Sequence, residues 1–142
     1  MSDERASHLL SRAINNEDNA SLEGLTTSKI KTIKNDVLQQ LQLPRNKLIE
    51  FHRKLKEYRF VGDLDSLRYG SYVRWINLTD PTLKLTNGGI VCDMQVQDKG
   101  LIIKCRNRFH RIFQFCMDEC LVFQKFSEQE TILLAALDYL NS

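Results

Sequence analysis

Apolar residues recur at helical spacing over two neighbouring stretches in the first half of the chain. Residues 28–42 and 44–58 each place an apolar residue every three or four positions, which predicts two helices. Thr27 or Ser28 supplies a capping oxygen for the first helix. Pro44 must end that helix, because proline has no amide proton, and it also suits the first turn of a new helix. The apolar positions are Ile30, Ile33, Val37, Leu38 and Leu41, followed by Leu48, Phe51, Leu55 and Tyr58.

After Tyr58 the apolar period changes from about 3.6 residues to two, which is typical of strands. Gly, Asn and Pro residues separate short runs of β-forming residues, and Asp98-Lys99-Gly100 predicts a tight hairpin. The predicted strands are 72–76, 90–96, 101–106, 111–115 and 121–125.

The alternation also predicts which way the strand side chains point. If Trp75 is inside together with Val73, then Tyr72, Arg74 and Ile76 face the helices or a partner. In the second predicted strand the same rule places four residues on the apolar face: Ile90, Cys92, Met94 and Val96.

The C-terminal segment carries the clearest local signal. Ser127-Glu128-Gln129-Glu130 is a capping box, in which the serine and the last glutamate each satisfy a free amide. The residues that follow form an apolar helical face, so we expect this helix to pack against the strands. The apolar positions are Ile132, Leu133, Ala136, Leu137 and Leu140.

These elements predict an α+β fold with N-terminal helices, a small β-barrel and a C-terminal helix. A strongly bent five-stranded meander protects its edges by closing, so an SH3-like or Tudor-like barrel is favoured and an OB-like barrel is the alternative. The expected organisation is a mobile N-terminal segment (1–26), a basic helical pair (27–59), the barrel (60–126) and a C-terminal helix on the barrel (127–142).

The positive charge of the chain is concentrated in the predicted helices. The net charge of the whole chain is only +2, but residues 27–60 hold nine Lys or Arg against three acids, a local net of +6. A second basic group brackets the predicted turn at residues 107–110, with an aromatic ring at its tip. Cations beside a flat ring are what a nucleic acid requires, for its phosphates and for its bases. The candidate contact residues are Lys29, Lys31, Lys34, Lys47, Arg53, Lys54, Lys104, Arg106, Arg108, Phe109 and Arg111.

Other interpretations of the same residues remain open. The charges also fit a solvated helix face with an ordinary charged turn, or a surface for a protein partner in a complex. Tyr69, Tyr72 and Trp75 are candidates for a Tudor-like aromatic cage around a methylated lysine, although Trp75 or Tyr72 equally suits a core.

The sequence carries no recognisable catalytic or cofactor motif, so we expect a non-catalytic binding module without metal, cofactor or small-molecule substrate. The alternative is a Cys–His enzyme using His110 with Cys105, Cys116 or Cys120. The same four residues would also make a zinc set, but only one close cysteine pair is present. Because Cys92 and Cys105 share the phase of apolar strand positions, we interpret the thiols as core residues.

Three segments together resemble small uncharacterised proteins of large nucleocytoplasmic DNA viruses: residues 62–76, 85–91 and 120–126. The resemblance implies action in the host cytoplasm or in the virion, where the protein would be a minor virion or complex subunit, and it assigns no functional residue. The absence of a long apolar run and of a secretory pattern independently predicts an intracellular protein without a membrane partner, with the nucleus also possible.

Overall fold

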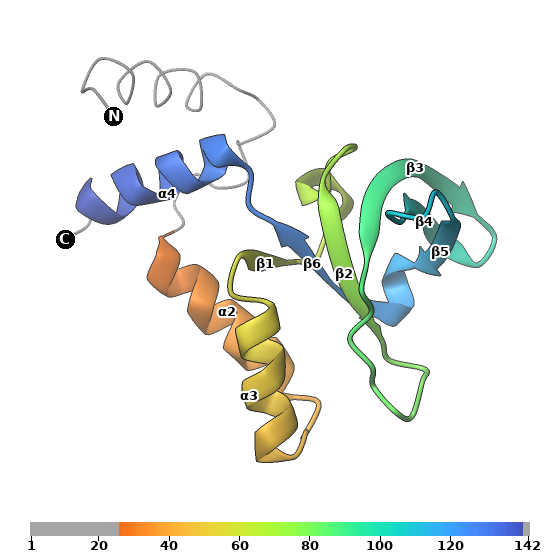
Figure 1. Cartoon of the computed structure of the whole chain (residues 1–142), viewed down its shortest axis with the longest axis horizontal. Helices are drawn as coiled ribbons and strands as arrows, with labels where there is room; N and C mark the ends of the chain where they lie inside the picture. The colour runs from red at the N-terminus through yellow and green to blue at the C-terminus, as the bar shows by residue number, and fades with distance from the viewer. Residues whose placement is uncertain (1–25, 141–142) are drawn as a thin grey trace.

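The computed structural model describes residues 26–140, in which three helices accompany one six-stranded antiparallel sheet (Figure 1). The expectation for residues 1–25 therefore lies outside the described residues. No helix within 26–140 combines the length and the apolar character that crossing a membrane requires. The helices are α2 (Thr27–Gln39), α3 (Arg45–Lys54) and α4 (Glu128–Leu140), with short 3₁₀ turns η2 (Leu64–Ser66) and η3 (Met117–Glu119). The strands are β1 (Tyr58–Val61), β2 (Tyr72–Asn77), β3 (Gly89–Gln97), β4 (Gly100–Arg106), β5 (Ile112–Cys116) and β6 (Cys120–Lys125).

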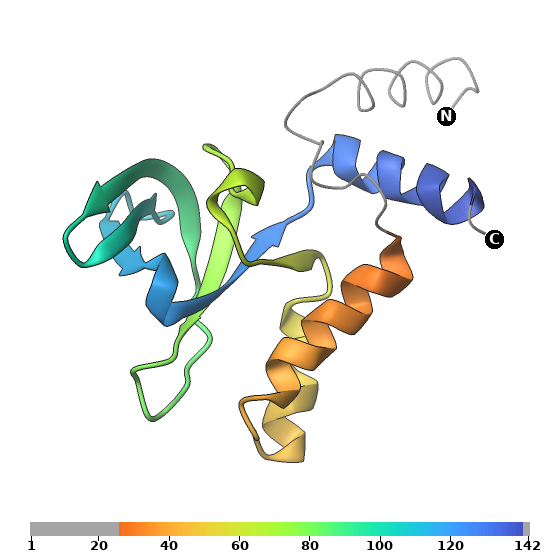
Figure 2. The same ribbon diagram turned by 180° about the vertical axis from the view of Figure 1, so that it is seen from behind.

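The strands follow the order β1-β6-β2-β3-β4-β5 and form a curled but open sheet. The two views show α2 and α3 near β1, whereas β3, β4 and β5 curl away on the other side (Figures 1 and 2). The curl brings Phe115 of β5 over Trp75 of β2, with ring centroids 4.3 Å apart. The predicted α+β class is confirmed, but the closed barrel is wrong. Within residues 26–140, β1 pairs only with β6, β5 pairs only with β4, and these two edges of the sheet do not join.

The sheet has two buried faces, as the alternation in β2 predicts. Val73 and Trp75 belong to the inner core, which the curl of the sheet encloses. Ile76 is fully buried on the other face, in a cluster with Leu38 of α2 and Phe51 of α3, and Tyr72 packs against that cluster. The expectation that Tyr72 and Ile76 face the helices is therefore confirmed.

The strand β1 replaces the end of the second predicted helix. Helix α3 ends at Lys54, and Tyr58 already pairs with Lys125 of β6. The chain turns between them because the amino group of Lys34 donates to the carbonyl oxygens of Leu55 and Tyr58, each at 2.9 Å. Lys34 is 5% exposed, so the prediction that it belongs to a cationic surface is wrong. Its charge instead holds the connection between α3 and β1.

The predicted phase of the second strand is wrong at Ile90, Cys92 and Val96, which are exposed, and is confirmed at Met94, which packs against the inner core. The pairing of β3 with β4 shifts register between Val91 and Asp93, so Cys92 is the extra residue of a bulge. Val91 is buried, whereas Cys92 is exposed and Val96 is 86% exposed. A bulge inverts which side chains face the core, and nothing in the local alternation signals it.

The capping box of α4 is confirmed. The Ser127 hydroxyl accepts from the Glu130 amide at 3.1 Å, and a Glu130 carboxylate oxygen accepts from the Ser127 amide at 3.0 Å. The carboxylate of Glu130 is 1% exposed and also pairs with two guanidinium groups, those of Arg59 and Arg68. Leu133 and Leu134 then pack against Ile30 of α2.

Candidate functional site

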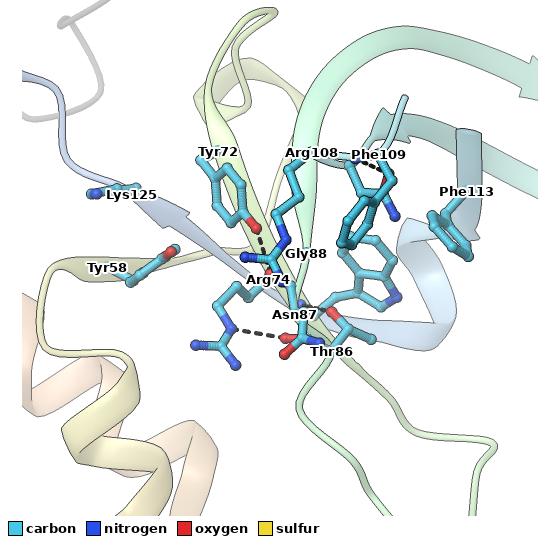
Figure 3. Close-up of a pocket in the computed structure, with 12 residues that line it drawn as sticks. Tyr58, Tyr72, Arg74, Thr86, Asn87, Gly88, Arg108, Phe109, Phe113 and Lys125 are labelled. Atoms are coloured by element: carbon cyan, nitrogen blue, oxygen red, sulfur yellow. Dashed lines mark hydrogen bonds between the residues drawn. The ribbon is translucent and has the colours of Figure 1, made fainter. Parts of the chain in front are cut away.

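A cavity of about 630 Å³ opens beside β2, where residues from five segments of the chain meet. Figure 3 shows Tyr58, Lys125 and Tyr72 on one side of it, with Arg108, Phe109 and Phe113 on the other. The lining residues are Tyr58, Tyr72, Arg74, Trp75, Thr86, Asn87, Gly88, Asn107, Arg108, Phe109, Phe113 and Lys125.

The segment Thr86–Gly88 fixes the floor of the cavity against β2. The Nε atom of Arg74 donates to the carbonyl of Thr86 at 2.8 Å, and the Tyr72 hydroxyl donates to the carbonyl of Asn87 at 2.6 Å (Figure 3). Gly88 has φ +80°, and a Cβ atom there would lie 2.0 Å from the carbonyl oxygen of Val73. Only glycine permits this approach, which in turn orients the Arg74 and Tyr72 side chains.

The turn between β4 and β5 presents Arg108 and Phe109 to the cavity. The side-chain oxygen of Asn107 accepts from the amides of Phe109 at 2.9 Å and Arg111 at 3.0 Å. His110 takes up φ +62°, a left-handed conformation that lets the chain return into β5. Within the turn the Arg108 guanidinium lies 4.8 Å from the centre of the Phe109 ring, a cation–π contact.

Among residues 26–140, those that line the cavity carry positive charge and include no carboxylate. Its charged residues are Arg74, Arg108 and Lys125. The acid that pairs with one of them is Glu57, 3.8 Å from the Lys125 amino group, and both side chains are about half exposed or more. Such an exposed pair contributes roughly 0–1 kcal/mol and does not neutralise the cavity. Burial raises the pKa of Tyr58, and the charge of Arg74 opposes that rise, so the Tyr58 hydroxyl stays neutral at physiological pH.

Five aromatic rings accompany the three cations. Tyr58 and Trp75 are almost buried, whereas Phe109 is 67% exposed and Phe113 is 47% exposed. Tyr72 is half-buried between them. The cavity thus offers buried rings at its base and exposed rings at its rim.

The structure brings together two groups of residues that the sequence suggested separately. Arg108 and Phe109 come from the basic turn, and Tyr72 and Trp75 come from the proposed aromatic cage. Tyr69, the third member of that cage, is 62% exposed and does not line the cavity. A methylated lysine would meet three positive charges here, so the lining favours an anionic ligand over a cationic one.

The remaining basic candidates lie elsewhere. Lys104 and Arg106 belong to β4, and Arg111 lies on the turn. Arg106 and Arg111 are exposed and Lys104 is half-buried, but none of the three lines the cavity. The exposed cations of α2 and α3 do not line it either: Lys29, Lys31, Arg53 and Lys54.

Two of the predicted helix cations have partners within the protein. Lys54 forms an ion pair with Glu50 at 2.7 Å, and Lys47 donates to the carbonyl of Thr82 at 2.6 Å. The structure therefore does not unite the helices and the turn into one site.

The sequence prediction missed several of the lining residues, among them Tyr58, Phe113 and Lys125. Tyr58 and Lys125 are brought together by the pairing of β1 with β6, which is a long-range feature. Phe113 had a usable signal, because it lies two residues before the buried Phe115 in β5 and therefore shares the face that Phe115 turns toward Trp75.

Within residues 26–140, no cysteine forms a hydrogen bond with His110, as a reactive Cys–His pair would require. Burial raises the pKa of Cys105 and of Cys120 to about 12, so both stay protonated near neutral pH. Cys116 ends β5 and His110 precedes its beginning, so the strand separates them. Within residues 26–140 no three His, Cys, Asp or Glu side chains are grouped as metal ligands would be.

The chain matches no protein-family model, no curated protein and no solved structure. The resemblance to proteins of large DNA viruses accordingly stays a prediction.

Proposed function

We propose that this protein is a non-catalytic module that binds nucleic acid through the cavity beside β2. The observation that supports the proposal is the convergence of Arg74, Arg108 and Lys125 with five aromatic rings on a cavity that no carboxylate lines. Cations pair with phosphates, and rings stack on bases. The predicted interface comprised the basic helices and the basic turn. The proposal keeps the turn at residues 107–111, leaves out the helices and adds β2 and Lys125.

The proposal is tested by fluorescence anisotropy of labelled DNA and RNA strands at low ionic strength. We expect binding that weakens steeply as salt is added, because displaced counterions dominate such affinity. Arg108→Glu should reduce the affinity at least severalfold. Arg53→Glu, which reverses an exposed arginine on α3, is the matched control and should have a smaller effect.

Two results would contradict the proposal. The first is no binding to either polymer at low ionic strength, and the second is equal affinity of wild type and Arg108→Glu. The separate Cys–His hypothesis would require an enzymatic activity of the unchanged protein that His110→Ala abolishes while the variant still folds.

A protein-assembly role is the second candidate, and the edge of the sheet favours it. β5 pairs only with β4, and its Ile112 side chain is 57% exposed. An uncovered edge strand with apolar side chains can add a strand from a partner chain, as a complex or virion subunit would require. Co-purification of one partner at fixed stoichiometry, insensitive to nuclease and abolished by Ile112→Lys, would support this role. Kinship with SH3-like, Tudor-like or OB-like folds also stays a proposal, since the sheet is open.

A further inference from the structure

We infer that the cavity takes one unpaired nucleobase of a single strand, stacked on its aromatic rings, with the flanking phosphates on the surrounding cations. This inference rests on the proposed function and makes it more specific. It predicts recognition of single strands over duplexes, and of bases in addition to phosphates.

The size of the cavity supports a single small occupant. Its volume of about 630 Å³ lies within the range of roughly 300–1,000 Å³ that is typical of pockets for one small molecule. A duplex exposes only base edges in its grooves, whereas an unpaired base offers its flat face to a ring. A recessed cavity lined with rings therefore suits a base that has left the stack.

The arrangement of rings supports stacking. Phe109 stands at the rim with two-thirds of its surface exposed, and Arg108 already covers part of the ring at 4.8 Å. Across the cavity the Tyr72 ring is held in place by the bond from its hydroxyl to the carbonyl of Asn87 (Figure 3). A base between the exposed rim ring of Phe109 and the fixed ring of Tyr72 would gain contact on both faces with little reorganisation of the floor.

The cations surround this position. The Nε atom of Arg74 is held by the carbonyl of Thr86, which leaves the four N–H groups of its two Nη atoms for a phosphate. Arg108 and Lys125 approach the cavity from opposite sides (Figure 3). The phosphate before the bound base and the phosphate after it would therefore each lie near a cation. The side-chain amide of Asn87 lies at the same cavity and can bond to the edge of the base.

Trp75 provides a direct reporter, because it is the single tryptophan of the chain and lines the cavity. The experiment titrates full-length protein with an oligothymidylate strand, the same strand paired with its complement, and an abasic strand with equal phosphates. We expect oligothymidylate to change the Trp75 emission. The duplex and the abasic strand should bind roughly 5- to 150-fold more weakly, which is the effect of losing one stacked base, and should leave the emission unchanged.

Two variants of similar exposure sharpen the test. Phe109→Ala should weaken oligothymidylate binding while leaving affinity for the abasic strand unchanged. Tyr69→Ala removes a ring that is 62% exposed but lies outside the cavity, and it should behave as wild type. Because both rings are largely exposed, neither change should prevent folding.

The outcomes separate the inference from the proposed function. If the oligothymidylate and abasic strands bound equally and the Trp75 emission did not change, the inference of a base pocket would be wrong, but the proposed binding of nucleic acid would still hold. A free thymidine mononucleotide that bound as tightly as the strand would also overturn it, because the ligand would then be a nucleotide and not a strand. Binding of none of these ligands at low ionic strength would overturn the proposed function itself.

Discussion

Arginine side chains occupy two contrasting settings in this protein. Arg59 and Arg68 lie against the buried carboxylate of Glu130, which joins β1, the η2–β2 connection and the first turn of α4. Arg74 and Arg108 instead line a cavity without a carboxylate. Arg59 and Arg68 stabilise the fold through these ion pairs, whereas Arg74 and Arg108 are placed to bind an anionic ligand. The role of each of these arginines therefore depends on whether a buried carboxylate lies beside it, which local sequence does not reveal.

The largest expected effect comes from breaking the buried pair. Glu130→Ala would leave two guanidinium groups without their carboxylate and would remove half of the capping box. Burial already lowers the pKa of Arg59, an effect that the charge of Glu130 opposes. We expect the free energy of unfolding to fall by about 3–5 kcal/mol, measured by urea denaturation. Glu128→Ala, an exposed acid in the same turn, should cost less than about 1 kcal/mol.

The cavity arginines should show the opposite behaviour. Arg108→Gln should weaken nucleic-acid binding by about 1.5–3 kcal/mol, the range for a lost charged hydrogen bond. It should change the free energy of unfolding by no more than about 0.5 kcal/mol, because the side chain is exposed. Parallel anisotropy and denaturation measurements test this separation. A loss of stability equal to that of Glu130→Ala would remove the distinction between the two settings.

A smaller effect is expected from the residue that shapes the turn. Asn107→Ala removes acceptors from the amides of Phe109 and Arg111 and should destabilise the protein by about 1 kcal/mol. Binding should weaken severalfold, because Arg108 and Phe109 would no longer be held toward the cavity. Asn46→Ala, at an exposed position on α3, is the control. Unchanged binding by Asn107→Ala would mean that the turn need not be pre-organised.

The smallest expected effect is a dependence of the free energy of unfolding on pH, which arises from His52 on α3. Burial, followed by the charge of Lys34, lowers the pKa of His52, whose Nε2 atom lies 3.1 Å from the Asn35 side-chain oxygen. The unfolded state then binds the proton more readily, so stability is complete above pH about 6.5 and declines as pH falls toward the folded pKa.

Denaturation at several pH values between about 7.5 and 5.5 measures this decline. His52→Gln should make it shallower, and Asn46→Ala, an exposed position on the same helix without a titrating group, should not. An unchanged slope in His52→Gln would show that His52 does not couple protonation to folding.

Local signals predicted part of this architecture well. In the capping box at Ser127 and in the Asp98–Gly100 hairpin, the residues that interact are only a few positions apart in the sequence. Both form as expected. Simple alternation in β2 correctly placed Val73 and Trp75 on one face, opposite Tyr72 and Ile76.

Long-range pairing explains what the sequence did not reveal. The strand β1 has four residues, too few for a pattern, and it exists because β6 lies beside it. The bulge at Cys92 reversed an otherwise regular alternation. Four of the twelve lining residues followed from the basic turn and the proposed aromatic cage, namely Arg108, Phe109, Tyr72 and Trp75. Tyr58 and Lys125 reach the cavity only through the pairing of β1 with β6.

The most direct test of the central claim is the salt dependence of single-strand binding. The slope of log affinity against log salt counts the phosphates that the protein neutralises, at about 0.7 per contact for single strands. Replacing Arg74, Arg108 and Lys125 together by glutamine should reduce the magnitude of that slope by about 2. Replacing Lys29, Lys31 and Arg53 by glutamine should leave it unchanged. A slope that falls in the helix variant and persists in the cavity variant would contradict the account.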